Sequence, residues 1–301
     1  MESNQGVCSS KLEMSRYMKK IIFNNLLFAA ILILIAACAA NEVYMEYAGL
    51  SAAPAPISLE ATATKPPPTP APTPTPTQTP TPSPTPAPPT PQPIIIAIDP
   101  GHQRQGNPNQ EPNGPGSATY KAKVSSGTRG VATGVPEFEL VLEVSLLLRD
   151  ELIARGYEVF MIRECHDVNI SNATRAKMAT DAGADVFVRI HADASTNQNL
   201  TGIMTISHTK NNPYIPHLYQ QSRALSDAIL QEMVAATGAI SRGVWETDTM
   251  TGTNWATMPV TIIEMGFMTN HAEDRLMQTL EYQLKLVYGI ANGIDLFFAN
   301  N

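Results

Sequence analysis

The segment Pro93–Gly106, "PIIIAIDPGHQRQG", decides the fold of this chain. Its apolar run from Ile94 to Ile98 is typical of a strand that is buried on both faces. The run ends in Asp99-Pro100-Gly101-His102, where proline and glycine allow a tight turn. We therefore expect the strand to end at this turn and to present the imidazole of His102 at the edge of a sheet.

Strands and helices alternate after this first strand. Apolar residues at helical spacing predict a helix over Glu137–Arg155, and Gly156 is expected to cap it. Further helices are predicted over Asn172–Ala182, Leu218–Ala236 and Ala272–Phe298, and strands over Tyr157–Arg163, Ala184–His191, Gly202–His208, Gly243–Glu246 and Pro259–Met265. The region between the first strand and Pro136 is expected to be a long loop. This order predicts an α/β fold, a single domain with a mostly parallel twisted sheet flanked by helices on both faces.

The N-terminal region, residues 1–40, is predicted to be a signal or membrane-anchor segment. Met18, the expected true start, is followed by two lysines and an apolar run from Ile21 to Ala37. The run ends in Ile35-Ala36-Ala37-Cys38, which resembles the lipobox of bacterial lipoproteins. That resemblance implies that Cys38 becomes the lipidated N-terminus. An uncleaved membrane anchor and ordinary cleavage with secretion are the alternatives.

Residues 41–93 are predicted to be a disordered linker. They hold most of the 25 prolines of the chain, in repeats such as "PTPTPTQTPTPSPTP". Proline-rich chains prefer the extended polyproline II conformation, so the stretch from Pro54 to Pro93 would span at most about 120 Å. Such a segment is suited to be a stalk, and we expect all of the chemistry in residues 94–301.

The charge of the chain argues against nucleic acid as a partner. The formal net charge is -7, and no run of Lys or Arg occurs. Nucleic-acid binding proteins normally present a basic patch.

Four ionisable residues are predicted to meet at one edge of the sheet. His102 follows the first strand, His191 ends another, and Glu264 lies near the end of the last strand. Glu137 is in the first turn of the first helix, four residues before Val141, and therefore on the helix face that is turned to the sheet. Ligand sites in such sheets lie beyond the carboxyl ends of the strands. Two histidines and one carboxylate are a common zinc set, and a second carboxylate can handle protons.

Each of these residues also has a purely structural interpretation. A histidine at a strand end is often a hydrogen-bonded surface residue, and a glutamate in a first helical turn often serves the helix dipole. Glu264 alone could be a buried carboxylate that accepts hydrogen bonds from the backbone. His166 and His208 also follow strands, so position alone leaves them open as ligands. His217 and His271 lie at predicted helix starts and are expected to be solvent-facing or capping residues.

Four motifs together resemble one enzyme family. They are "IAIDPGHQ", the glutamate of "GVPEFELVLEVSLLLRDELIARGYEVFMIR", "ADVFVRIHADAS" and "MPVTIIEMGFMTN", in this order and at the family's spacing. They resemble the zinc-dependent N-acetylmuramoyl-L-alanine amidases, which hydrolyse bacterial cell walls. The resemblance covers essentially all of residues 94–301.

The resemblance implies one zinc ion per catalytic domain, held by His102, Glu137 and His191, with Glu264 as the catalytic residue. The choice of Glu137 over Glu139 rests on a count back from "ARGYEV" without a gap. Many family members have a serine where this chain has Arg189 and an asparagine where it has Asp193. These departures affect the expected rim of the substrate groove and replace no ligand. Asp99 is expected to be a turn acceptor near the site and not a ligand.

The implied reaction is hydrolysis of the amide between N-acetylmuramic acid and L-alanine in peptidoglycan. The alternatives are another zinc peptidoglycan peptidase and a non-catalytic wall-binding lipoprotein. The expected location is extracytoplasmic, on the outer face of the bacterial cell membrane, where the lipid anchor and the stalk let the domain reach the wall. The sequence does not identify an activator protein.

Overall fold

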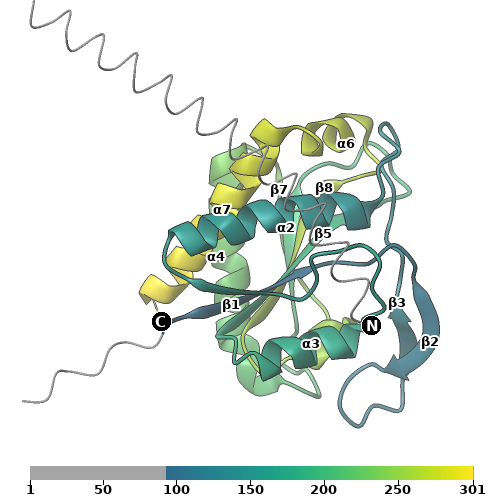
Figure 1. The fold of residues 1–301 in the computed structure, drawn as a ribbon, viewed down its shortest axis with the longest axis vertical. Coiled ribbons are helices and arrows are strands. Elements are labelled where there is room, and N and C mark those ends of the chain that lie inside the picture. The colour runs from purple at the N-terminus through teal and green to yellow at the C-terminus, as the bar shows by residue number, and fades with distance from the viewer. Residues whose placement is uncertain (1–92, 301) are drawn as a thin grey trace, which may run out of the picture. The chain divides into compact units, whose positions relative to one another are not determined.

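A six-stranded sheet forms the centre of the part of the chain that the structure describes, residues 93–300 of a computed structural model (Figure 1). The predicted signal segment with Cys38, and the linker up to residue 92, lie outside the described residues. The strands, in spatial order, are β4 (Glu158–Met161), β1 (Ile95–Pro100), β5 (Val186–Asp193), β8 (Val260–Phe267), β6 (Ile203–Ser207) and β7 (Ser241–Glu246).

The strand directions confirm the predicted mostly parallel sheet. β1 pairs with β4 and β5 in parallel, and β5 pairs with β8 in parallel. β6 runs antiparallel to β8 and parallel to β7. The carboxyl ends of β1, β5 and β8 therefore lie at the same edge of the sheet, where the sequence predicted the site.

One face of the sheet carries the larger apolar core. It is covered by α2 (Glu137–Ala154), α4 (Tyr219–Thr237) and α7 (Leu280–Asn300) (Figure 1). The strands contribute alternate residues to it, including Ile96 and Ile98 of β1 and Val188 and Ile190 of β5. The helical spacing noted in the sequence is the buried stripe of α2: Val141, Val144, Leu148 and Leu152 are fully buried. This face anchors α2 and so fixes where its first residue lies.

The opposite face carries a smaller apolar cluster and the polar residues of the site. α3 (Asn172–Asp181) packs there through Ala176 and Ala179 against Ala97 and Phe187 of the sheet. Because side chains alternate along a strand, the residues two positions after Ala97 and Phe187 share this face. Those residues are Asp99 and Arg189, and the next position on β5 is His191. The short helix α5 (Thr251–Asn254) and the 3₁₀ turn η1 (Pro216–Leu218) also lie on this side.

The predicted long loop before Pro136 is only partly irregular. It contains an antiparallel hairpin of β2 (Asn107–Pro112) and β3 (Tyr120–Val124), so the expectation of a loop throughout this region was wrong. The polar sequences of these strands, "NPNQEP" and "YKAKV", give no clear alternation. Glu111 near the turn of the hairpin and Val124 at its open end are both buried, so the hairpin packs on the domain.

Helix ends differ from the predicted ones by one or two residues in most cases. α2 ends at Ala154 with Arg155 as its cap, and Gly156 follows with a positive φ of 92°. The predicted last helix is divided into α6 (His271–Met277) and α7, because the chain turns at Gln278 and Thr279. The helix α5 was not predicted.

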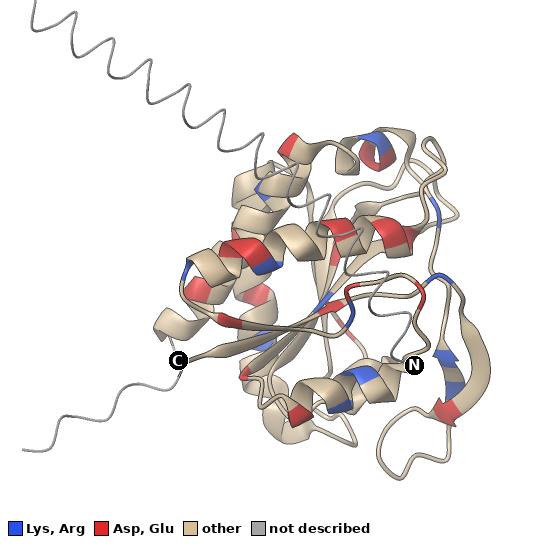
Figure 2. Cartoon of the chain, viewed as in Figure 1, with Lys and Arg blue, Asp and Glu red and all other residues tan. Residues whose placement is uncertain are grey.

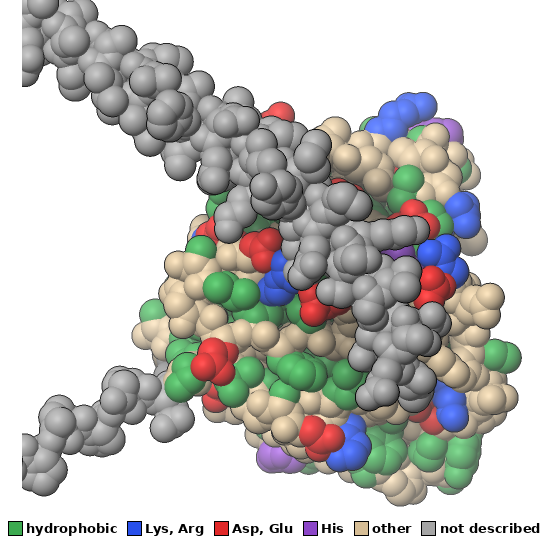
Figure 3. All heavy atoms as spheres, viewed as in Figure 1, with side chains coloured by type: hydrophobic (Ala, Val, Ile, Leu, Met, Phe, Trp, Pro, Cys, Tyr) green, Lys and Arg blue, Asp and Glu red, His purple; other side chains and the backbone are tan. Residues whose placement is uncertain are grey.

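Charged side chains of both signs are interspersed over the described residues (Figure 2). On the face shown in Figure 3, hydrophobic side chains lie between polar and charged ones. No helix within residues 93–300 is long and apolar enough to cross a membrane.

Candidate active site

Three side-chain atoms from three elements meet at the carboxyl edge of the sheet. Nε2 of His102 lies 3.1 Å from Oε1 of Glu137 and 3.1 Å from Nδ1 of His191. Nδ1 of His191 lies 3.2 Å from the same Oε1. His102, Glu137 and His191 are the one His/Cys/Asp/Glu group among residues 93–300 whose atoms could converge on a metal ion. The structure therefore brings together the three residues that the sequence predicted as ligands.

His102 is held in an unusual backbone conformation just beyond β1. Its φ is +59°, in the left-handed region, and it is the one non-glycine residue with a positive φ among the described residues. Such a conformation is disfavoured and persists where surrounding contacts enforce it. Arg175 donates to the carbonyl of His102 at 2.8 Å, and Arg163 donates to the carbonyls of Pro100 and Gly101. Two buried arginines thus fix the turn that aims the imidazole.

Gly101 is required by the close approach of His191 and not by its own φ. A Cβ at Gly101 would lie 2.3 to 2.6 Å from three atoms of the His191 ring. The ring of His191 also meets that of His102 edge to face, with centroids 4.7 Å apart. The tight turn predicted from "DPGH" therefore also leaves room for the second imidazole.

Glu137 is the first residue of α2 and is buried. Its Oε2 accepts from the backbone N–H of Thr128 at 2.9 Å, and its Oε1 accepts from the N–H of Ala192 at 3.2 Å. Burial alone would raise its pKa, but hydrogen bonds from His102 and His191 outweigh this and hold the pKa of Glu137 well below its usual range. Glu137, and not Glu139, supplies the carboxylate of the cluster.

His191 is kept neutral by burial. Removal from water, with the proximity of His102, lowers the pKa of His191 to about 4 against the opposing effect of Glu137. A neutral imidazole offers a lone pair, which a metal ligand needs. Its Nε2 is buried and has no hydrogen-bond partner among the described residues.

The segment Ser125–Thr128 completes the cluster, and sequence reasoning missed it. Nδ1 of His102 lies 3.0 Å from the backbone carbonyl of Ser125 and 3.0 Å from its hydroxyl. At Gly127, where φ is +80°, a Cβ would lie 2.7 Å from Oε2 of Glu137 and 2.9 Å from the His102 ring. The glycine of "SSGTRG" was the available signal, because only glycine lets the backbone pass so close.

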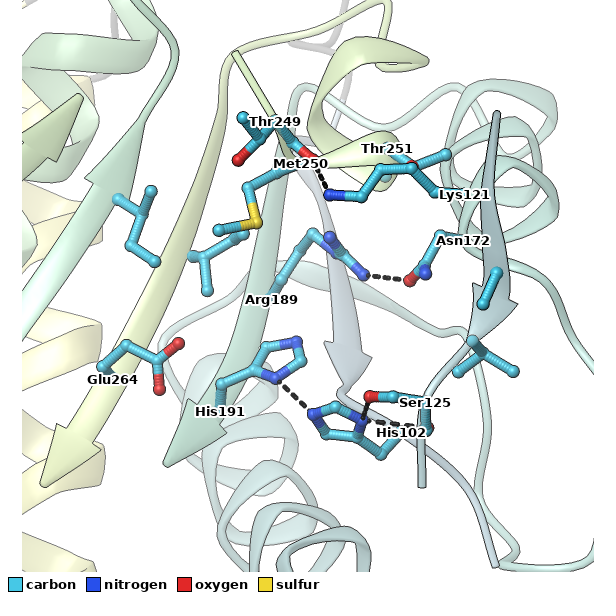
Figure 4. Close-up of a pocket in the computed structure, with 15 residues that line it drawn as sticks. His102, Lys121, Ser125, Asn172, Arg189, His191, Thr249, Met250, Thr251 and Glu264 are labelled. Carbon is cyan, nitrogen blue, oxygen red and sulfur yellow. Dashed lines mark hydrogen bonds between the residues drawn. The ribbon is translucent and has the colours of Figure 1, made fainter. Parts of the chain in front are cut away.

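Glu264 faces the same pocket from β8, directly opposite His191 in the strand register (Figure 4). Its Oε2 is buried without a hydrogen-bond partner in the described residues. Burial, reinforced by the negative charges of Glu137 and Asp193, raises the pKa of Glu264 well above its usual range. A carboxyl group with a raised pKa can hold a proton near neutral pH and exchange it.

Asp99 is the centre of a buried charge network and lies outside the cluster. It is fully buried, with Arg175 Nη1 2.5 Å from Oδ1 and Arg189 Nε 2.9 Å from Oδ2. Burial alone would raise its pKa, but the two guanidinium groups hold the pKa of Asp99 well below its usual range. Through Arg175, the same network reaches the carbonyls of Pro100 and His102. The expectation that Asp99 supports the turn agrees with this geometry.

The remaining histidines lie apart from the cluster. His166 packs edge to face on Phe138, and His208 on Tyr219, each with one buried ring nitrogen that has no partner among residues 93–300. His217 and His271 are exposed at helix starts, as expected from the sequence.

A pocket of about 370 Å³ extends from the histidines over the sheet face (Figure 4). Its floor includes His191, Arg189 and Glu264, and the hairpin supplies Lys121 as part of one wall. Arg189 was expected at the rim, but it is only 4% exposed and lies in the floor. The volume of the pocket is within the range of ligand pockets, about 300–1,000 Å³.

The cluster fits a zinc ion in its donors, spacing and protonation. Tetrahedral zinc has bonds of about 2.0 Å to nitrogen and oxygen, which places ligands about 3.3 Å apart. A carbonyl oxygen can only accept a hydrogen bond, so the contact with Ser125 places a proton on Nδ1 of His102 and leaves Nε2 to face a metal. Nε2 of His102 lies 3.1 Å from Oε1 of Glu137, the distance of a hydrogen bond. A metal ion that takes the place of the proton between them would bind both atoms.

Comparison with known proteins identifies the family of the chain. The family model described as N-acetylmuramoyl-L-alanine amidase matches residues 96–295. An N-acetylmuramoyl-L-alanine amidase of Mycobacterium tuberculosis is 27% identical, over 68% of this chain and 87% of that protein. The amidase AmiC of Neisseria meningitidis is 25% identical over 67% of this chain, and the chain spans about half, 52%, of its length.

A solved structure shares the fold. The crystal structure of the N-acetylmuramyl-L-alanine amidase Ami1 from Mycobacterium smegmatis superimposes with a TM-score of 0.63 at 25% identity, over 69% of this chain and 98% of that one. The family model covers the sheet except for Ile95, the first residue of β1, and it covers every residue of the cluster. The chain therefore belongs to the N-acetylmuramoyl-L-alanine amidase family, the peptidoglycan hydrolases that cut the amide between N-acetylmuramic acid and L-alanine.

Proposed function

We propose that this chain hydrolyses its amide substrate with one zinc ion held by Nε2 of His102, Oε1 of Glu137 and Nδ1 of His191. The observation that carries the proposal is the triangle of these three atoms, with sides of 3.1 to 3.2 Å. When bound, zinc supplies Lewis acidity, which lowers the pKa of water and polarises a carbonyl group.

The residues around the triangle orient its donor atoms. The Ser125 carbonyl holds the tautomer of His102, and the backbone N–H groups of Thr128 and Ala192 hold the two oxygens of Glu137. Removal of such outer contacts typically lowers metal affinity or activity by about 10- to 100-fold. The preset carboxylate and the neutral His191 support a site whose ligands are formed before the metal arrives.

Glu264 is proposed as the proton carrier of the reaction. Its carboxylate faces the pocket opposite His191 and has a buried oxygen without a partner in residues 93–300. In its ionised form the carboxylate takes a proton from the attacking water. The protonated Oε then gives this proton to the departing amino group of L-alanine, which restores the carboxylate.

We also propose that the full chain has three parts. Residues 1–40 direct export and anchor the protein through Cys38, residues 41–93 form a stalk, and residues 94–301 are the catalytic domain. This assignment rests on the lipobox-like Ile35–Cys38 and the Thr–Pro repeats. It gives an extracytoplasmic lipoprotein whose domain reaches peptidoglycan from the outer face of the cell membrane.

The activity is tested by product analysis on purified peptidoglycan with the full chain. We expect new N-terminal alanine and free lactyl carboxyl groups on muramic acid, and loss of both when a chelator removes the metal. New amino groups on later stem residues would identify a peptidase instead. No products from metal-loaded protein would favour a wall-binding lipoprotein.

The anchor is tested separately by lipid labelling in cells. Wild-type protein should incorporate labelled lipid, and Cys38→Ser should not incorporate it or mature normally. Absence of lipid on the wild-type chain would contradict the lipoprotein assignment and leave the catalytic proposal intact.

A further inference from the structure

Arg189 has one hydrogen-bond donor group that the fold leaves unused. The residue lies on β5 two positions before His191 and is only 4% exposed. Its Nε donates to Asp99 at 2.9 Å and its Nη2 donates to Asn172 at 2.9 Å. No residue within 93–300 accepts from its Nη1, although the guanidinium lines the pocket (Figure 4). Nη1 is not among the buried polar atoms that lack a partner in residues 93–300, so it is open to the pocket, where a ligand can accept a hydrogen bond from it.

The surroundings of Arg189 make it rigid. Asp99 is its register partner on β1 and Asn172 begins α3, so two elements hold the guanidinium plane. At Gly252 of α5, a Cβ would lie 2.5 Å from Nη1. The same Cβ would lie 2.6 Å from Cζ and 2.9 Å from Nη2, so the glycine lets the backbone of α5 pack closely on the guanidinium group and helps to hold it. A fixed guanidinium loses little entropy when it binds an anion.

Charge divides the pocket into two ends. Glu264 and the histidine cluster occupy one end, whereas Arg189 and Lys121 bring positive charge to the rest of the lining. Lys121 Nζ is bound to the carbonyl of Thr249 at 2.5 Å, so it closes the wall and adds its charge there. An acidic group of a ligand is favoured at the arginine end, and guanidinium groups match carboxylates in shape and charge.

The spacing selects one group of a stem peptide. Residues two apart on a strand are separated by about 6.6 Å, which is the offset between Arg189 and His191. Two residues of an extended peptide also span at most about 7 Å. A carboxylate two residues beyond the scissile amide thus reaches Arg189 while the scissile carbonyl is at the cluster. The second stem residue, a glutamate joined onward through its side chain, has its α-carboxyl group there, as a free acid or as an amide.

We propose that Nη1 of Arg189 binds the free α-carboxylate of the second stem residue and makes this enzyme select the acid over the amide. This inference rests on the proposed function, because it assumes that the scissile amide lies at the His102–Glu137–His191 cluster. Arg189 is then a specificity-determining residue, and its contact with Asp99 serves to aim it.

The test compares two muropeptides that differ only in this group, α-carboxylate or α-carboxamide, with the full chain. Wild type should show a kcat/KM about 10- to 100-fold higher for the acid, the discrimination typical of a buried charged hydrogen bond. Arg189→Gln should bring the ratio close to one. In the Glu264→Gln background, calorimetry should show the same preference in Kd, which measures binding without turnover.

Two further variants separate recognition from folding. Gly252→Ala keeps Arg189 but places a methyl group against Nη1, Cζ and Nη2, so the guanidinium group must move and the preference should fall even if Arg189→Gln does not fold. Arg163→Gln is the matched control: it removes a buried arginine of the same turn that does not line the pocket. It should lower both rates and leave their ratio unchanged.

Equal kcat/KM for the two substrates in wild type would overturn the inference and leave the amidase function standing. An unchanged preference in Arg189→Gln or Gly252→Ala would also overturn it. If wild type cleaves neither muropeptide although it binds zinc, the proposed function fails together with the inference.

Discussion

The two faces of the sheet bury different kinds of side chain. The face under α2, α4 and α7 is filled with aliphatic side chains. The face toward α3 buries Asp99, Arg175 and Arg189 close to the cluster of Glu137 and the histidines. The first face gains from burial alone, whereas each charged group on the second requires a partner. The larger apolar core thus lies on one side of the sheet, and the charged groups beside the reaction site lie on the other.

The largest expected effect comes from removing a member of the cluster. His102→Ala, His191→Ala and Glu137→Ala should each reduce bound zinc and activity together, with activity falling to background. Glu139→Ala is the matched control, because it lies in the same helical turn but outside the cluster. Metal analysis and amide cleavage on the same samples check this. Full zinc in Glu137→Ala would exclude Glu137 as a ligand.

Asp99 tests whether the charged face also contributes to stability. Asp99→Asn leaves buried guanidinium groups without their counterion, which typically costs about 3–5 kcal/mol. The control is Asp167→Asn, whose surface pair with Arg104 is mostly exposed and contributes about 0–1 kcal/mol in general. Denaturant unfolding at neutral pH measures both changes. Equal stability of the two variants would show that the network around Asp99 is not coupled to folding.

The pH dependence of the unfolding free energy is a second test of Asp99. The folded-state pKa of Asp99 is depressed, so its contribution is present above its unfolded pKa, about 3.9, and is lost as the pH falls below that value. The unfolding free energy of Asp99→Asn should therefore decrease less steeply than that of wild type on acidification below about pH 5. Parallel curves would contradict the assigned pKa direction.

Substitutions on the apolar face of the sheet are expected to change the stability of the domain but not its catalytic activity. Leu148→Ala opens a cavity at a fully buried position of α2 and should lower the unfolding free energy by about 2–5 kcal/mol. Ile153→Ala on the same helix is 53% exposed and should change it by only about 0.5 kcal/mol. Folded Leu148→Ala should keep its zinc and its kcat/KM. A loss of metal from the folded variant would show that the faces are not separable.

The helices and strands that show a clear pattern of apolar residues were predicted from the sequence. The strand before Asp99, the helix after Pro136 and the strand ending at His191 were predicted with small errors at their ends. Because sites lie at the carboxyl ends of parallel strands, the sequence also predicted that His102, His191 and Glu264 lie at one edge of the sheet. Their meeting with Glu137 was predictable because α2 begins at that same edge.

What was missed depends on contacts between distant segments. The hairpin β2–β3 has a polar sequence without clear periodicity, and its contact with the site becomes visible only in the fold. The burial of Arg163 and Arg175 results from carbonyl groups of the turn after β1, which no local pattern marks. Arg189 was recognised as a departure from the family, but its place in the pocket floor follows from its pairing with Asp99.

The most direct test of the account is Glu264→Gln, measured for bound zinc and amide cleavage on the same sample. The amide keeps the size of the side chain and can still hydrogen-bond water, but it cannot accept a proton from it. We expect stoichiometric zinc with a rate lower by about 10²- to 10⁴-fold, the usual contribution of a general acid–base. Activity near that of wild type, or loss of the metal, would contradict the account, because Glu264 would then be a bystander or a ligand.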